Sequence, residues 1–144
     1  MTPSSPNHQG PVCPQQEVVG VIVGYGDLPN ALREAALSII NDPEALEAVS
    51  SVSRRAEGLD ARLDAIVARS PGKAILLFAD LYGSSCALSG IRFQDRHPGT
   101  AVLCGVNLPM LVRFLHYRRR LCYAELASFL RQTGSEEIRP AGKP

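Results

Sequence analysis

Two glycine-containing segments carry the residue types best suited to chemistry. Gly24-Tyr25-Gly26-Asp27 and Asp80-Leu-Tyr-Gly83-Ser84-Ser85 each follow an apolar run and precede a segment with helical periodicity. Glycine lets backbone N–H groups approach a ligand, and a helix N-terminus adds free N–H groups and a partial positive charge. Ser84 and Ser85 add hydroxyl donors. Together the loops are suited to binding an anion such as phosphate; the alternative is that the glycines only shape turns.

Asp80 is the strongest single candidate in these loops. It stands at the end of the apolar run 74–79, where a carboxylate needs a hydrogen-bonding partner. One interpretation is that it caps the next helix through backbone amides. Another is that it orients a side chain of the neighbouring loop, and the two are compatible. Cys86 follows this loop as either a nucleophile activated by the helix N-terminus or a small buried residue, and we expect the buried residue.

Short apolar runs alternate with amphipathic patterns along the chain. This alternation predicts right-handed βαβ crossovers and a small doubly wound α/β domain, with a mainly parallel four-stranded sheet and helices on both faces. Ligands of such sheets bind outside the carboxyl ends of the strands, which selects the loops 24–27, 80–85 and 105–109. The predicted strands are 18–23, 48–52, 74–79 and 101–104, and the predicted helices include 32–40, 59–67, 86–96, 108–117 and 124–131.

The length of 144 residues and a hydrophobic content of 45% fit one globular domain. Residues 1–16 are polar and proline-rich, and we expect a disordered tail there. The domain is expected over residues 17–139, followed by a C-terminal tail at 140–144. No apolar run approaches the roughly 20 residues that span a bilayer. We therefore expect a cytoplasmic protein without direct membrane insertion.

Charge is balanced overall but uneven along the chain. The net charge of +1 combines −4 over residues 17–80 (10 acidic, 6 basic) with +5 over residues 81–144 (4 acidic, 9 basic). Arg113 and residues 118–120 form a basic run, which is either a solvated helix end or a docking patch for an acidic partner. Aromatic residues are not interleaved as in single-stranded nucleic-acid platforms, so nucleic-acid binding is not expected.

The four cysteines, Cys13, Cys86, Cys104 and Cys122, form no C-x-x-C pair. They lie in apolar stretches, which favours buried free thiols in a reducing compartment. We expect no metal site and no cofactor.

Several motifs resemble one family, the mannose-type enzyme IIA domain of the phosphoenolpyruvate:sugar phosphotransferase system (PTS). Val106-Asn-Leu-Pro-Met-Leu111 is similar to its signature, and Asp80–Ser85 is similar to its second loop, usually D-L-x-G-G-S. Residues 21–28 resemble its first strand and loop, and residues 133–138 resemble its ending. The resemblance runs from about Val18 to Ile138.

This resemblance implies a flavodoxin-like fold, usually in a homodimer, and a place in a phosphoryl relay. In the family, the phosphocarrier HPr phosphorylates a histidine in the first loop, and the IIA domain passes the group to a IIB domain. By the same resemblance, Asp80 orients residue 25, while Ser85 and the loop amides hold the phosphoryl group. The candidate phosphate-binding residues are Gly24, Gly26, Gly83, Ser84 and Ser85, and the candidate partner-binding residues are Asn107, Pro109, Met110 and Arg113.

The sequence departs from the family at the decisive position. Tyr25 stands where the family has its histidine, and Ser84 stands where glycine is usual. The three histidines are elsewhere: His8 in the expected tail, His97 at the end of the third predicted helix, and His116 inside the fourth. A phenol has an ordinary pKa of about 10, against about 6.5 for imidazole, and an aryl phosphate is a poor phosphoryl donor.

Three hypotheses follow. In the first, the chain is a regulatory or binding module that has lost the relay, with Tyr25 hydrogen-bonded to Asp80 and with HPr or another PTS protein as partner. In the second, it is an active phosphocarrier that uses Tyr25 or another residue. In the third, it senses a phosphorylated metabolite at the strand ends.

Overall fold

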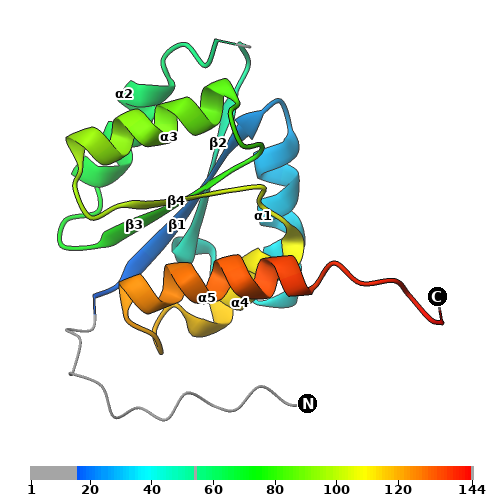
Figure 1. The fold of residues 1–144 in the computed structure, drawn as a ribbon. Helices are drawn as coiled ribbons and strands as arrows, with labels where there is room; N and C mark the ends of the chain where they lie inside the picture. Colours follow the sequence, from blue (N-terminus) through cyan, green and yellow to red (C-terminus); the bar gives the residue numbers. More distant parts are fainter. Residues whose placement is uncertain (1–15, 54, 144) are drawn as a thin grey trace.

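Four parallel strands form the central sheet in the order β2-β1-β3-β4 (Figure 1). The structure is a computed structural model, and it describes residues 16–53 and 55–143. The predicted α/β fold with a parallel four-stranded sheet is confirmed. The elements are β1 (Val18–Tyr25), α1 (Leu28–Ile39), the 3-10 turn η1 (Pro43–Ala45), β2 (Leu46–Ser51), α2 (Leu59–Ala68), β3 (Ala74–Ala79), α3 (Ser85–Arg96), β4 (Ala101–Cys104), α4 (Leu108–Tyr117) and α5 (Tyr123–Glu136).

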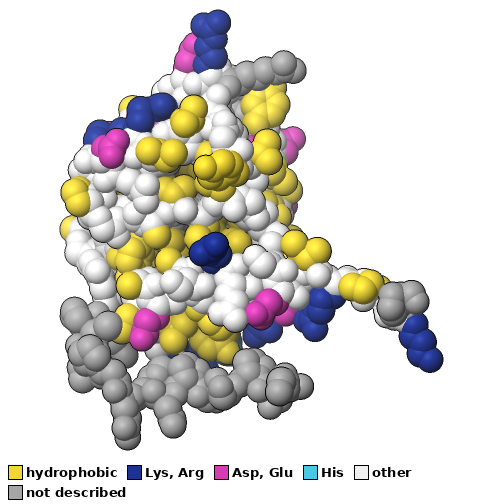
Figure 2. Space-filling view, in the orientation of Figure 1, with side chains coloured by type: hydrophobic (Ala, Val, Ile, Leu, Met, Phe, Trp, Pro, Cys, Tyr) yellow, Lys and Arg dark blue, Asp and Glu magenta, His cyan; other side chains and the backbone are white. Residues whose placement is uncertain are grey.

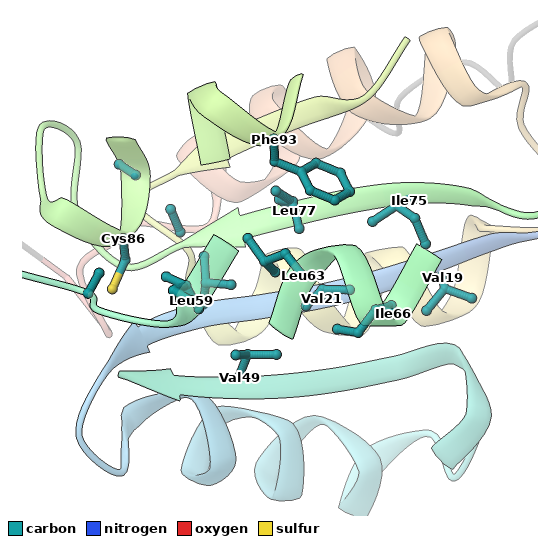
Figure 3. Packing of buried hydrophobic residues seen from close by; sticks show 14 residues of the cluster. Val19, Val21, Val49, Leu59, Leu63, Ile66, Ile75, Leu77, Cys86 and Phe93 are labelled. Atoms are coloured by element: carbon teal, nitrogen blue, oxygen red, sulfur yellow. The ribbon is translucent and has the colours of Figure 1, made fainter. Parts of the chain in front are cut away.

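Helices cover both faces of the sheet. Helices α2 and α3 lie on one face, and α1, α4 and α5 lie on the other (Figure 1). Strand β1 is buried on both sides because its side chains alternate between the two cores. Val19, Val21 and Val23 pack under α2 and α3 (Figure 3), whereas Val18 and Ile22 join the core of the opposite face.

The predicted bounds are met by β3, β4 and α4, those of α2 and α3 differ by one residue, and α5 differs most. It continues to Glu136, five residues beyond the predicted end. Gly134, a residue type that commonly marks a helix end, lies inside α5 because the helix passes close to α4 there. A Cβ at this position would lie 2.7 Å from the Met110 Cε.

The basic run at the end of α4 divides into a buried and an exposed part. The Arg118 side chain is 2% exposed, and its guanidinium donates to Asp42 at 2.8 Å and to the Val18 carbonyl at 3.1 Å. Arg119 is 69% exposed. The interpretation of the run as one solvated patch is therefore wrong for Arg118, which links α4 to β1 and to the segment before η1.

Two cysteines are free thiols and one is not. Cys86 and Cys104 are free, as expected. Cys122 is disulfide-bonded, which corrects the expectation for this residue. It lies in the short connection between α4 and α5, at the N-cap of α5, and is half-buried. Cys13 and the rest of the expected tail before Gln16 lie outside the described residues.

No helix in the described ranges is long and apolar enough to cross a membrane.

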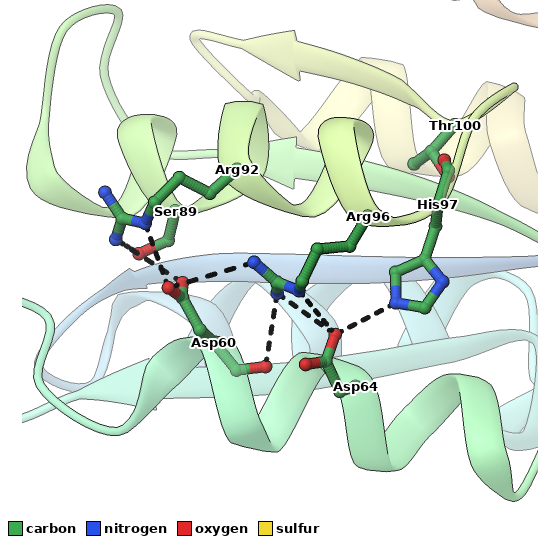
Figure 4. Close-up of polar contacts among 7 residues, drawn as sticks. All are labelled: Asp60, Asp64, Ser89, Arg92, Arg96, His97 and Thr100. Atoms are coloured by element: carbon green, nitrogen blue, oxygen red, sulfur yellow. Dashed lines mark hydrogen bonds and ion pairs between the residues drawn. The ribbon is translucent and has the colours of Figure 1, made fainter.

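An ion-pair network joins α2 to α3 (Figure 4). The Arg92 Nε donates to Asp60 at 2.9 Å, and the Arg96 Nη2 donates to Asp64 at 3.0 Å. The His97 Nε2 lies 2.9 Å from the Asp64 Oδ1. The hydrogen bond from Arg92 lowers the pKa of Asp60 against the effect of burial. Burial alone would raise the pKa of Asp64, but the bonds from His97 and Arg96 outweigh it, and the pKa is lowered.

We expect this network to make stability depend on pH in the acid range. Because both folded-state pKa values are lowered, the network's contribution is complete above the ordinary value of 3.8. It is lost as the pH falls through the lowered values. Exposed pairs contribute about 0.2–1 kcal/mol each. Urea unfolding at pH 6 and pH 3 measures the loss, which is expected to shrink in the double variant Asp60→Asn, Asp64→Asn. Asp95→Asn, on the exposed face of α3, is the control; an equal effect there would contradict the assignment.

Candidate functional site

The candidate site lies where β1, β3 and β4 end. The chain leaves β1 for β2 on one side of it and returns to β3 on the other, so β1 and β3 flank the point where the strand order reverses. Ligands of open α/β sheets bind at this kind of position. Tyr25 is the last residue of β1, and Asp80 directly follows β3. The two loops proposed from the sequence are therefore neighbours in the fold.

Glycines allow the two loops to approach each other. A Cβ at Gly24 would lie 3.2 Å from the Asp80 Cβ and 3.2 Å from the Pro29 Cγ, which is tighter than ordinary contact. Gly26 and Gly83 have φ values of +65° and +81°, in the left-handed region where a side chain is strained. These three glycines bring the backbone of Tyr25 within reach of the Asp80 carboxylate.

The Asp80 carboxylate connects the two loops through backbone and hydroxyl donors. Its Oδ1 accepts from the Leu81 N–H and from the Ser84 Oγ, both at 2.8 Å. Its Oδ2 accepts from the Tyr25 N–H at 3.3 Å. Asp80 is thus not itself the cap of α3. Ser84 is the N-cap, and its Oγ accepts from the Ala87 N–H at 3.0 Å.

The Tyr25 side chain points into solvent with 54% of its surface exposed. The contact between Tyr25 and Asp80 is made by the backbone N–H, not by the phenol. The expected side-chain hydrogen bond to Asp80 is therefore replaced by a backbone bond. Because the backbone makes this contact, any residue type at position 25 except proline can keep it.

The third loop is held by Asn107. Its side chain caps α4 by accepting from the Met110 N–H at 3.0 Å, and its amide nitrogen donates to the Gly134 carbonyl at 3.0 Å. Met110 is buried and Pro109 is half-buried. Arg113 is exposed and lies 3.5 Å from Glu137. Of the four candidate partner-binding residues, Arg113 therefore presents the most accessible polar group, while Asn107 fixes the loop.

Two thiols lie near the carboxylate but are not activated. Burial raises the pKa of Cys86 and of Cys104, and the negative charge of Asp80 raises both further. Both residues therefore remain protonated at neutral pH. The alternative that the helix N-terminus activates Cys86 as a nucleophile is wrong, because burial and the nearby carboxylate both disfavour the thiolate.

The histidines of the described chain lie away from the strand ends. His97 follows the last turn of α3 and contacts Asp64. His116 is near the C-terminal end of α4, packed edge-on against Tyr117 with ring centroids 4.7 Å apart. The strand-end loops 24–27, 80–85 and 105–109 contain no histidine. Within the described ranges, no cluster of three potential metal ligands is present.

Large exposed apolar side chains lie at or just after the ends of β1, β2 and β3. We call this group the edge patch; its members are Tyr25, Leu28, Val52, Leu81 and Tyr82, all exposed. Tyr82 is 88% exposed. The patch includes five of the nine exposed large hydrophobic residues of the described chain, and contiguous exposed apolar surface is typical of interaction sites. Sequence reasoning missed four of these residues, although apolar side chains within glycine-rich loops are a usable signal.

The family model for the PTS system fructose IIA component, EIIA-man, matches residues 20–130. The chain belongs to this mannose-type IIA family.

Solved structures support the same fold. The mannose/sorbose-specific IIA subunit from Enterococcus faecalis has a TM-score of 0.76 at 20% identity, covering 90% of this chain and 98% of that one. A putative phosphoenolpyruvate-dependent sugar PTS permease from Klebsiella pneumoniae has a TM-score of 0.76 at 19% identity, covering 91% and 96%. Component EIIA from Streptococcus agalactiae has a TM-score of 0.76 at 20% identity, covering 85% and 96%. No curated protein matches the chain significantly.

Proposed function

We propose that this protein is a regulatory binding module of a phosphotransferase system that does not relay phosphoryl groups. The observation that carries the proposal is Tyr25 at the end of β1, exposed and beside the loop that begins at Asp80. Family membership implies interaction with PTS proteins such as HPr. The module acts in the cytoplasm by presenting the strand-end edge to such a partner.

The chemistry of the side chain at position 25 supports loss of the relay. Imidazole is largely unprotonated near neutral pH and forms an N–P bond that passes its phosphoryl group onward. A phenol, with an ordinary pKa of about 10, is a weak nucleophile at pH 7, and its phosphate ester is too stable to be a good donor. Among the described residues, Asp80 contacts Tyr25 through the backbone N–H, so this carboxylate does not act as a general base for the phenol.

The edge patch is the proposed docking surface. Its two tyrosines combine a large apolar body with a polar tip, a combination enriched at protein interfaces. Gly83 and Ser85 at the start of α3 are the proposed contacts for an anionic group of the partner, because a helix N-terminus carries a partial positive charge. Arg113 is a proposed charged contact at the margin of this surface.

Tyr82→Ala is expected to weaken binding of HPr roughly tenfold, in line with the loss of an aromatic residue central to an interface. Isothermal titration calorimetry with purified HPr, phosphorylated and unphosphorylated, measures the effect. Ile39→Ala is the matched control: Ile39 is also exposed, but it lies at the opposite end of α1. Absence of HPr binding to the unmodified chain, or an equal loss in the control, would contradict the docking surface.

We also propose a homodimer formed across β4. The two edges of the sheet differ. At the β2 edge, the Arg33 Nε donates to the Leu46 carbonyl at 2.6 Å, and the Arg62 Nη1 donates to the Ser50 carbonyl at 2.5 Å. At the β4 end of the sheet, the Tyr123 hydroxyl accepts from the Ala101 N–H and donates to the Ile75 carbonyl, so it bridges β4 to β3 and does not cover the outer edge of β4. Figure 2 looks toward β4 and shows hydrophobic side chains between α3 and α5. An open strand edge beside apolar surface favours pairing with a second chain.

Sedimentation equilibrium is expected to give twice the chain mass of 15.5 kDa. The reason is that pairing satisfies the open backbone groups of β4 and covers the apolar surface beside it. A single-chain mass at micromolar concentrations would exclude the homodimer and leave the binding function to the monomer.

A further inference from the structure

We infer that Ser84 is a positioning residue that fixes the orientation of the Asp80 carboxylate and so weakens its contact with a side chain at position 25. The inference rests on the proposed function and deepens it. It identifies Ser84, in the loop between β3 and α3, as a second feature that impairs phosphoryl transfer, in addition to the loss of the histidine.

The contacts of the Ser84 hydroxyl carry this inference. The Oγ donates to the Asp80 Oδ1 at 2.8 Å and accepts from the Ala87 N–H at 3.0 Å. The Ser84 N–H donates to the Leu81 carbonyl at 3.1 Å. The hydroxyl is thus held between α3 and the carboxylate. Its donated hydrogen bond fixes the orientation of the carboxylate plane relative to the helix.

The donors around Asp80 leave its carboxylate one open acceptor site out of about four, and that site is on Oδ2. Oδ1 accepts two donors, Ser84 Oγ and Leu81 N–H, which fill its two lone-pair sites. Oδ2 accepts from the Tyr25 N–H. Because both Oδ1 donors belong to the loop between β3 and α3, they fix the plane of the carboxylate relative to that loop. Glycine at position 84 removes one Oδ1 donor without adding another, so the carboxylate gains freedom to rotate toward a ring at position 25.

The consequence concerns phosphoryl transfer to an imidazole placed at position 25. In that step, the lone pair of one ring nitrogen forms a bond to phosphorus as the N–P bond of phosphorylated HPr breaks. The electron pair of the broken bond returns to the HPr imidazole. The other ring nitrogen at position 25 keeps its proton, and a carboxylate that accepts this N–H orients the ring and stabilises the charge that develops on it. With Ser84 present, Asp80 does this poorly.

The test compares three variants: Tyr25→His, Tyr25→His with Ser84→Gly, and Tyr25→His with Ser84→Thr. Each is incubated with phosphoenolpyruvate, enzyme I and a range of HPr concentrations, and initial labelling rates are read by intact mass. Releasing Asp80 is expected to raise kcat at least about tenfold in the Ser84→Gly double variant with KM for HPr little changed, because the effect is on the acceptor and not on docking. The threonine double variant keeps the hydroxyl and is expected to match Tyr25→His alone.

Two outcomes would overturn the inference. One is equal kcat in all three variants, each shown to be folded by circular dichroism and thermal unfolding. The other is a rise caused equally by threonine, which would show that the hydroxyl is not the determinant. Labelling of the unmodified chain at Tyr25 would instead contradict the proposed function and leave the role of Ser84 to be read from the variants, so the two failures are distinguishable.

Discussion

Replacing Tyr25 by histidine is expected to convert a chain that stays unphosphorylated into one that carries an acid-labile phosphoryl group. The imidazole would stand at the end of β1, next to Asp80, where the backbone contact at 3.3 Å does not depend on the side chain. An imidazole has an ordinary pKa near neutrality, so its free ring nitrogen is a much better nucleophile at pH 7 than the protonated phenol. Intact mass after incubation with phosphoenolpyruvate, enzyme I and HPr measures the gain.

Ile39→His is the control for this prediction. Ile39 is exposed but lies at the far end of α1, outside the edge patch and away from Asp80. This control variant should remain unlabelled, because surface imidazole alone does not reproduce the site. Labelling of both variants would mean that HPr phosphorylates any exposed histidine here. Labelling of neither would mean that the strand-end loops have diverged beyond these substitutions.

Arg118→Ala is expected to lower the free energy of unfolding by about 3 kcal/mol, the lower end of the range for breaking a buried ion pair. The guanidinium is almost fully buried and contacts Asp42 and the Val18 carbonyl. Its removal leaves both acceptors without their donor. Asp42 retains partial solvent access, which limits the loss. Against a typical total of about 5–15 kcal/mol, this is a large effect. Urea unfolding is expected to show a lower midpoint with an unchanged m-value.

The neighbouring Arg119→Ala variant controls for the loss of one positive charge from the same helix end. Arg119 lies 3.9 Å from Asp42 but is mostly exposed, and exposed pairs contribute only about 0–1 kcal/mol. We expect its midpoint to stay close to that of the unmodified chain. Equal destabilisation by the two substitutions would show that net charge, not the buried contacts, explains the effect of Arg118.

Apolar runs were sufficient to predict the sheet. β3 and β4 have the predicted bounds because each is a short, continuous apolar run. β2 begins two residues earlier than predicted because the turn η1 leads directly into it, a feature without periodicity. The extension of α5 past Gly134 depends on its packing against Met110, and such tertiary contacts override local helix signals.

The position of the site at the strand ends was predictable from the sequence, but its hydrogen bonds were not. Strand adjacency alone brings the loops of Tyr25 and Asp80 together, and their sequences indicated this. The bond from Ser84 to Asp80 and the backbone contact of Tyr25 depend on side-chain orientation and loop conformation. Local patterns do not encode these features. For the same reason the burial of Arg118 was not predicted, since a run of arginines is ordinarily solvated.

The most direct test of the proposed function is the intact mass of the unmodified protein in a complete relay. The protein is incubated with phosphoenolpyruvate, enzyme I and HPr, and binding to HPr is measured on the same preparation. We expect an unchanged mass of the protein together with measurable HPr binding. A stoichiometric acid-labile phosphoryl adduct on the unmodified chain would contradict it and identify an active phosphocarrier.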